Sequence, residues 1–273
     1  MWWNSLILWF SNLHPVVAAL IATTFTWLIT ALGASLVFFF KKLNRAILDS
    51  MLGFTGGVMV SASCFGLLGP AIEMTGGTGF SKTIPSVVGF IFGALFLYGL
   101  DKVMPHLHIN FKEAEKEGMK SNLHRTTLLI LAITLHNIPE GLAVGVVFGA
   151  AMGEFDLINT AVILTMGIAI QNFPEGFAVA MPLRREGVSR KKSFWYGQLS
   201  AIVEPIFGVI GAALVLYFEP ILPYALAFAA GAMIYVVVEE VIPETQRDKY
   251  TDVATLGFMI GFILMMALDV GLG

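Results

Sequence analysis

The feature that most constrains this chain is a series of eight long apolar segments joined by short polar connections. A helix that crosses a bilayer needs about 20 mainly apolar residues, and lipid offers its backbone no hydrogen-bond partners. We therefore predict an all-α integral membrane fold of eight transmembrane helices, forming a single transmembrane domain over residues 1–273. The helices are predicted at roughly 16–40, 46–74, 85–104, 124–150, 157–182, 193–218, 221–242 and 253–272.

The composition agrees with lipid as the main solvent. Charged residues make up 13% of the chain and hydrophobic residues 57%, whereas a soluble domain carries about 25% charged residues. So few charges cannot cover a water-facing surface. The net charge is −3 and basic residues form no block, so nucleic acid is not an expected partner. The one cysteine, Cys64, excludes a disulfide or a cysteine-based metal cluster within one chain.

The basic residues predict an orientation in the membrane. Of the 16 Lys and Arg residues, only Lys82 falls on the side opposite the others. Positive charge accumulates on the cytoplasmic side of membrane proteins. We therefore expect a protein of the cell membrane with both termini outside the cytoplasm. The one long connection, 105–123, is predicted to be cytoplasmic.

Glycines recur at a spacing of four residues in three of the segments. Small residues at this spacing let helix backbones approach closely in lipid, so we predict helix contacts there. The glycines are Gly89 and Gly93, then Gly141, Gly145 and Gly149, and finally Gly257 and Gly261.

A six-residue motif occurs twice, in the fourth and fifth segments. The residues HNIPEG begin at His136, and the residues QNFPEG begin at Gln171. Successive transmembrane helices run in opposite directions, and both motifs lie near the middle of a segment. The two copies should therefore face each other near the bilayer midplane, related by a two-fold axis in the membrane plane. Many transporters bind their substrate at the interface of such inverted repeats.

The spacing within each motif places its polar groups on one helix face. Residues three and four apart are neighbours on a helix, so Glu140 and Glu175 each share a face with the polar residues that precede them. Each motif proline lacks an N–H and so leaves a backbone carbonyl without its helical partner. The polar residues are His136, Asn137 and Glu140 in the fourth segment and Gln171, Asn172 and Glu175 in the fifth.

Glu204 adds a third carboxylate inside an apolar segment, and no Lys or Arg lies deep in any segment. A charged side chain at the bilayer centre costs about 2.5–3.5 kcal/mol on insertion scales. These carboxylates must be protonated or balanced by a mobile cation. Imidazole, carboxylate and amide oxygen without thiolate suit a borderline divalent ion. Zinc, Zn2+, fits best, with iron, manganese, cobalt and cadmium as alternatives.

Other acidic and imidazole residues lie near the predicted helix ends. On the cytoplasmic side they are candidates for a metal exit path, although charges are also normal at solvated helix ends. On the outer side, Glu73 and Asp269 are candidates for gathering cations at an entrance. The exit candidates are Asp101, His106, His108, Glu239, Glu240 and Glu244.

Three other functions stay open at this point. A cation channel with a carboxylate constriction has a similar pattern, and the orientation does not define the direction of net flux, so efflux is a further alternative. An intramembrane metalloenzyme needs an activated water beside a general base. The chain lacks a His-Glu-x-x-His helix and has only one histidine inside the apolar part of a segment, so we predict that it is not an enzyme.

The two motifs resemble the signatures on the fourth and fifth helices of ZIP metal transporters, most closely those of the GufA-like bacterial branch. The resemblance extends over nearly the whole chain, through residues 100–108, 203–205, 239–244 and 268–269. It implies eight helices in a 3+2+3 arrangement, with the first three and last three related by inversion. It also implies metal import into the cytoplasm, a homodimer, and an elevator-like movement of one helix group against another.

The resemblance further implies a site for two metal ions. In that assignment Glu140 and Glu175 bridge the two ions. The first ion would bind His136, Glu140, Gln171 and Glu175, and the second would bind Asn137, Glu140, Asn172, Glu175 and Glu204.

Overall fold

The computed structural model describes residues 2–40, 44–106, 118–119, 125–152, 154–185, 187–247 and 249–272. Within these residues, eight helical segments are long and apolar enough to cross a membrane. Their ends lie within a few residues of the predicted ones. The prediction of an all-α integral membrane protein is therefore confirmed. Most of the predicted cytoplasmic connection lies outside the described residues.

Several of the eight spans are built from more than one helical piece. The first span is α2 (Pro15–Ser35) with η1 (Leu36–Phe38), and the second is α3 (Arg45–Ser61), η2 (Ala62–Leu68) and α4 (Gly69–Glu73). The third to fifth spans are α5 (Phe80–Val103), α6 (Arg125–Ala151) and α7 (Phe155–Arg185). The sixth is α8 (Arg190–Leu199), η4 (Ser200–Ile202) and α9 (Val203–Tyr217), followed by η5 (Glu219–Ile221). The seventh is α10 (Leu222–Val236), η6 (Val237–Val241) and α11 (Ile242–Thr245), and the eighth is α12 (Thr251–Leu272).

A short helix that the sequence analysis did not predict precedes the first span. This helix, α1 (Trp2–Ser11), has 10 residues and is too short to cross a bilayer. It buries Ile7 and Phe10, and the Phe10 ring lies 5.3 Å from that of Phe148 on α6. The Trp3 indole also donates a hydrogen bond of 2.9 Å to Asn159 on α7. Packing against α6 and α7 thus fixes α1 to the bundle.

The second and seventh spans each contain a π-helical stretch, η2 and η6. A proline follows each stretch closely, Pro70 after η2 and Pro243 after η6. A proline inside a helix cannot donate to the carbonyl four residues back and clashes with it, so the hydrogen-bond ladder must adjust locally. Equivalent irregularities in these two spans are what an inverted repeat would produce, although the repeat itself stays a prediction.

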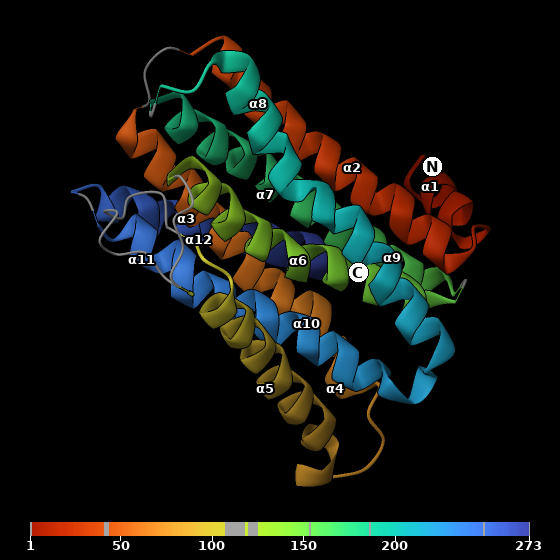
Figure 1. Ribbon diagram of the computed structural model, residues 1–273. Coiled ribbons are helices and arrows are strands. Elements are labelled where there is room, and N and C mark those ends of the chain that lie inside the picture. The colour runs from red at the N-terminus through yellow and green to blue at the C-terminus, as the bar shows by residue number, and fades with distance from the viewer. Residues whose placement is uncertain are drawn as a thin grey trace.

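The spans pack as two groups (Figure 1). In what we call the motif group, α2 packs along α7, and α6 packs along α9. In what we call the partner group, α3 packs along α12, and α5 packs along α10. Contacts of α10 with α6 and of α3 with α7 join the groups. Both predicted motifs, on α6 and α7, therefore belong to the same group.

The glycines explain why these pairs lie so close. A Cβ atom on Gly145 of α6 would lie 2.1 Å from the carbonyl oxygen of Gly208 on α9, so only glycine fits there. The predicted packing role of the four-residue spacing is confirmed in all three segments. Gly141 and Gly149 also face α9, Gly89 and Gly93 face α10, and Gly257 and Gly261 face α3.

Burial is uneven across the bundle. Helices α6 and α7 are buried along most of their length, whereas α5 and α12 expose most of theirs. The exposed side chains on α5 and α12 include large apolar ones such as Phe92, Leu95, Ile260 and Ile263. Apolar surface of this extent is expected against lipid. The two motif helices thus form the centre of the bundle, away from the lipid.

Candidate functional site

The two sequence motifs contact each other through reciprocal hydrogen bonds. Asn137 Nδ2 on α6 donates to Glu175 Oε1 on α7 over 3.0 Å, and Gln171 Nε2 on α7 donates to Glu140 Oε1 on α6 over 2.5 Å. Glu140 is fully buried and Glu175 is almost fully buried. Each carboxylate is therefore held by a neutral amide from the opposite motif, at the centre of the bundle.

Glu204, in the first turn of α9, lies in the same polar cluster. Asn172 Nδ2 donates to both of its carboxylate oxygens, over 2.9 and 3.1 Å. A hydrogen bond of 3.4 Å from Gln171 Nε2 to Asn172 Oδ1 connects this contact to the pair formed by Gln171 and Glu140. Glu204 and Asn172 are both fully buried. Glu140 on α6 and Glu204 on α9 are thus linked through the amide side chains of Gln171 and Asn172 on α7.

The first span contributes a residue that the sequence analysis did not name. The hydroxyl of Thr26 on α2 donates a short hydrogen bond to Glu204. Thr23, Thr26 and Thr30 are all fully buried, and their spacing of three and four residues places them on one helix face. This threonine stripe is the sequence pattern from which a role for Thr26 could have been predicted. On α3, the hydroxyl of Thr55 donates to the backbone carbonyl of Gln171 over 3.4 Å.

Two buried oxygens of the cluster have no hydrogen-bond partner among the described residues. They are Oε2 of Glu140 and Oε1 of Gln171. An unpaired buried acceptor is unfavourable because it has lost its water without gaining a donor. Carboxylate and amide oxygens are hard ligands for a divalent cation. Across the described ranges, no three His, Cys, Asp or Glu side chains are grouped closely enough to hold a metal together.

A narrow cavity of about 40 Å³ reaches this cluster. At roughly 10–15 Å³ for each water, this volume holds about three waters or one partly hydrated ion. Its polar lining comes from both helix groups, so it lies at their boundary. It is lined by Leu52, Thr55 and Met59 of α3, Ala132, His136 and Glu140 of α6, Glu175, Ala178 and Val179 of α7, Glu240 and Val241 of η6, and Glu244 of α11.

Of the predicted exit residues, Glu240 and Glu244 line this cavity. The Nε2 atom of His136 contacts the carboxylate of Glu240, so the one motif histidine bridges the two helix groups. Glu244 lies on α11, near the end of the bundle where α3 begins with Arg45. The cavity therefore extends from the two motifs toward the end of the bundle where most basic residues lie.

The other predicted exit residues lie elsewhere. Asp101 and His106 are buried and contact each other, with 3.1 Å between Oδ1 and Nε2. The His106 Nδ1 atom is also 2.8 Å from the carbonyl oxygen of Met104. Neither residue lines the cavity, and half-buried Glu239 does not line it either. His108 lies outside the described residues.

The two predicted entrance residues lie toward the opposite end of the bundle. Glu73 is exposed at the end of α4. Asp269 is partly buried on α12 and lies beside Gly66 of η2. Neither lines the cavity that reaches the motifs.

These features together define a class of protein. The chain is a multi-pass membrane protein with acidic groups buried at the centre of its helices and a cavity that leads to them from one end. Ionisable groups at membrane depth are typical of ion pathways, so the general design is that of an ion transporter.

Comparison with known proteins identifies the family. The profile described as ZIP zinc transporter matches residues 106–269. Human zinc transporter ZIP11 is 43% identical, covering 94% of this chain and 98% of its own length. Zinc transporter GufA of Myxococcus xanthus is 38% identical (94% and 99%), and zinc transporter ZIPB of Bordetella bronchiseptica is 39% identical (89% and 78%).

The chain belongs to the ZIP zinc transporter family. The resemblance inferred from the two motifs is therefore confirmed, including its likeness to the GufA-like branch. This is a family of transport proteins rather than of enzymes, which confirms the prediction that the chain is not a membrane metalloenzyme.

Proposed function

We propose that this protein carries zinc across the cell membrane toward the cytoplasm through the polar cluster on α6, α7 and α9. The observation that carries the proposal is the reciprocal contact between the motifs, in which neutral amides hold two buried carboxylates beside oxygens that lack a donor. A divalent cation would neutralise these carboxylates and satisfy those oxygens. The proposed ligands are His136, Asn137, Glu140, Gln171, Asn172, Glu175 and Glu204.

Rotation of the amide side chains provides a simple way for the site to change between a metal-free form and a metal-bound form. An Asn or Gln amide has donor and acceptor atoms at equivalent positions, so a half-turn exchanges N–H for oxygen. With their N–H groups inward, Asn137 and Gln171 hold Glu175 and Glu140. With their oxygens inward, the same side chains would add neutral ligands for a cation. Zinc binds four such nitrogen and oxygen ligands at about 2.0–2.2 Å.

One or two ions could occupy this arrangement. Glu140 and Glu175 belong to the half of the cluster that the cavity reaches. Asn172 and Glu204 form a second half, linked through Gln171 and held by Thr26. We propose the first half as the primary zinc site and the second as the weaker one, because Asn172 supplies no charge. Iron, manganese, cobalt and cadmium are further candidate substrates for the same oxygen and nitrogen ligands.

The cavity supports release on the cytoplasmic side. It extends from Glu140 and Glu175 past Glu240 to Glu244. The basic residues at that end, among them Arg45, Arg184 and Arg190, predict that it faces the cytoplasm. Both chain termini would then lie outside. An ion leaving the motifs would pass from one cavity-lining carboxylate to the next.

The two helix groups support an elevator-like movement. All seven proposed ligands belong to the motif group, whereas Thr55, Glu240 and Glu244 belong to the partner group. The motif group could therefore move with its ion as one body, and the contact between His136 and Glu240 would break as it slides. We further propose that the protein acts as a homodimer within the bilayer.

The proposal is tested by zinc uptake into liposomes that contain the purified protein and an internal fluorescent zinc indicator. Saturable uptake at low zinc concentration and slow turnover would support a carrier, whereas large single-channel currents would favour a channel. Glu140→Ala and Glu175→Ala should each abolish uptake. Glu154→Ala is the matched control, since Glu154 is an exposed acid between α6 and α7. Native uptake rates in both folded motif variants would overturn the site assignment.

A further inference from the structure

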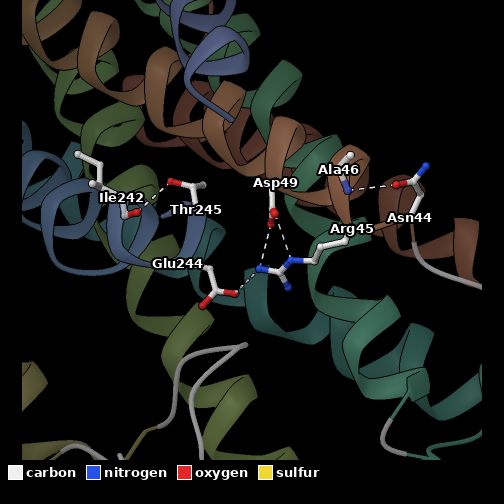
Figure 2. A network of polar contacts seen from close by, with 7 residues as sticks. All are labelled: Asn44, Arg45, Ala46, Asp49, Ile242, Glu244 and Thr245. Carbon is white, nitrogen blue, oxygen red and sulfur yellow. Dashed lines mark hydrogen bonds and ion pairs between the residues drawn. The ribbon is translucent and has the colours of Figure 1, made fainter. Parts of the chain in front are cut away.

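An arginine contacts two acidic side chains (Figure 2), one of which, Glu244, lines the cavity. Arg45 is the first residue of α3. Its Nη2 atom lies 2.9 Å from Asp49 Oδ1, and its Nε atom donates to Asp49 Oδ2 over 3.2 Å. The same Nη2 atom lies 3.7 Å from Glu244 Oε1 on α11. One guanidinium group thus connects the second and seventh spans.

The two contacts differ in strength. Asp49 is fully buried, one turn from Arg45, and receives two contacts of hydrogen-bond length. A guanidinium fork that meets both oxygens of a carboxylate is the strongest form of such a pair. The contact with Glu244, at 3.7 Å, is longer than a hydrogen bond. Arg45 is therefore anchored on Asp49, and Glu244 is the partner that can exchange.

Glu244 is also the last cavity-lining acid along the seventh span. On α3, Asp49 lies three residues before the cavity-lining Leu52, so Arg45 and Asp49 continue the same helix face beyond the cavity. A divalent cation that moves along the cavity would meet Glu244 while Arg45 holds its positive charge beside that carboxylate. The cation and Arg45 must then compete for Glu244.

We propose that Arg45 is a positioning residue for metal release, which acts by competing with the departing ion for Glu244. Held on Asp49, the guanidinium stays in place when Glu244 turns to the metal, and it recovers Glu244 when the metal leaves. The competition prevents Glu244 from trapping the ion at the cavity mouth. This inference rests on the proposed transport function, since it assigns the step that follows release from Glu140 and Glu175.

The proposal predicts opposite changes in zinc affinity and transport rate. In Arg45→Gln, Glu244 loses the competing guanidinium, so zinc should bind the purified full-length protein on the order of tenfold more tightly, a size typical of coupled binding events. The maximal uptake rate in liposomes should fall, because slow release limits turnover. Adding Glu244→Gln to Arg45→Gln should return the affinity to near its native value.

Two further variants keep the test decisive. Arg45→Gln removes the cation beside buried Asp49 and could therefore unfold. The double variant Arg45→Gln/Asp49→Asn removes both charges, and we expect it to bind zinc as tightly as Arg45→Gln. Arg190→Gln is the matched control, because it removes a positive charge at the same end while its contact is with the Phe38 carbonyl. Native affinity in the folded double variant, or an equal change in Arg190→Gln, would overturn the proposal.

The result also separates this inference from the transport function. If the native protein moves no zinc, the proposed function fails whatever Arg45 does. If native uptake is lost in Glu140→Ala but the Arg45 variants match the native protein in both affinity and rate, only the role of Arg45 is rejected.

Discussion

Two of the regions in which this protein buries carboxylates hold them in different ways. At the centre, Glu140 and Glu175 receive hydrogen bonds from the neutral amides of Gln171 and Asn137. Beyond the cavity, Asp49 receives two contacts from the permanent cation of Arg45. An amide stabilises a carboxylate without cancelling its charge, whereas a guanidinium does both. The difference suggests that the central acids are kept available for a mobile cation, and that Asp49 is not.

The largest expected effect tests the central acids. Glu140→Gln and Glu175→Gln keep the side-chain shape but remove the charge, so each should lower zinc uptake at least about 100-fold, beyond the loss seen when residues that only support metal ligands are changed. Initial rates in liposomes measure this. Asp49→Asn should retain a measurable rate. If Asp49→Asn and Glu140→Gln reduced uptake equally, the distinction between the two regions would fail.

Stability should change in opposite directions in the two regions. Asp49→Ala removes the acidic side chain nearest to Arg45 while Glu244 stays beside it, so it should lower the stability by less than the roughly 3–5 kcal/mol of a fully broken buried pair. Glu140→Gln removes a buried charge that has no fixed cation, so it should stabilise the metal-free protein, because functional sites commonly lower stability. Thermal unfolding in detergent with a chelator compares the two variants. A lower melting temperature for Glu140→Gln would show that the central acid serves the fold.

The position of Glu204 relative to the motifs depends on a close helix contact. A Cβ atom on Gly141 would lie 2.5 Å from the carbonyl oxygen of Glu204. Gly141→Ala should therefore push α9 from α6 and destabilise the protein by about 1–3 kcal/mol, as overpacking does. Gly271→Ala is the control, because a Cβ there has no neighbour within 4 Å among the described atoms. Equal melting temperatures for the two variants would contradict the close packing.

The smallest expected effect concerns the hydroxyl that holds Glu204. Thr26→Val removes a hydrogen bond of the kind worth about 1.5–3 kcal/mol when it is made to a charged group, so it should weaken zinc binding on the order of tenfold. Isothermal titration of the purified protein measures the change. Thr23→Val is the matched variant, because the Thr23 hydroxyl donates only to α2 carbonyls in the described structure. A similar loss in both variants would assign the effect to α2 rather than to Glu204.

The spans and the motifs could be predicted from sequence because their signals are local. Apolar length defines a membrane helix, and a spacing of three and four residues places Glu140 and Glu175 on the same face as their amide neighbours. The roles of Thr26 and Arg45 could not be predicted in this way. A threonine in a membrane helix often bonds to its own backbone, and the contact between Arg45 and Glu244 joins residues of two distant spans.

The predicted exit path shows the same limit. All six candidates were placed near helix ends by sequence, but of the five that the structure describes only Glu240 and Glu244 line the cavity that reaches the motifs. Asp101 and His106 instead contact each other. Helix register and the π-helical stretch η6 decide which side of the seventh span faces the cavity. Glu240 therefore lines the cavity and its neighbour Glu239 does not, a difference that sequence order does not reveal.

The central claim is that the amides and carboxylates of the two motifs bind the transported ion. Zinc K-edge X-ray absorption of the purified, zinc-loaded protein tests it most directly. We predict a first shell of nitrogen and oxygen alone, at about 2.0–2.2 Å, that is lost in the combined Glu140→Ala/Glu175→Ala variant. Sulfur scattering at about 2.3 Å, or an unchanged spectrum in that variant, would contradict the claim.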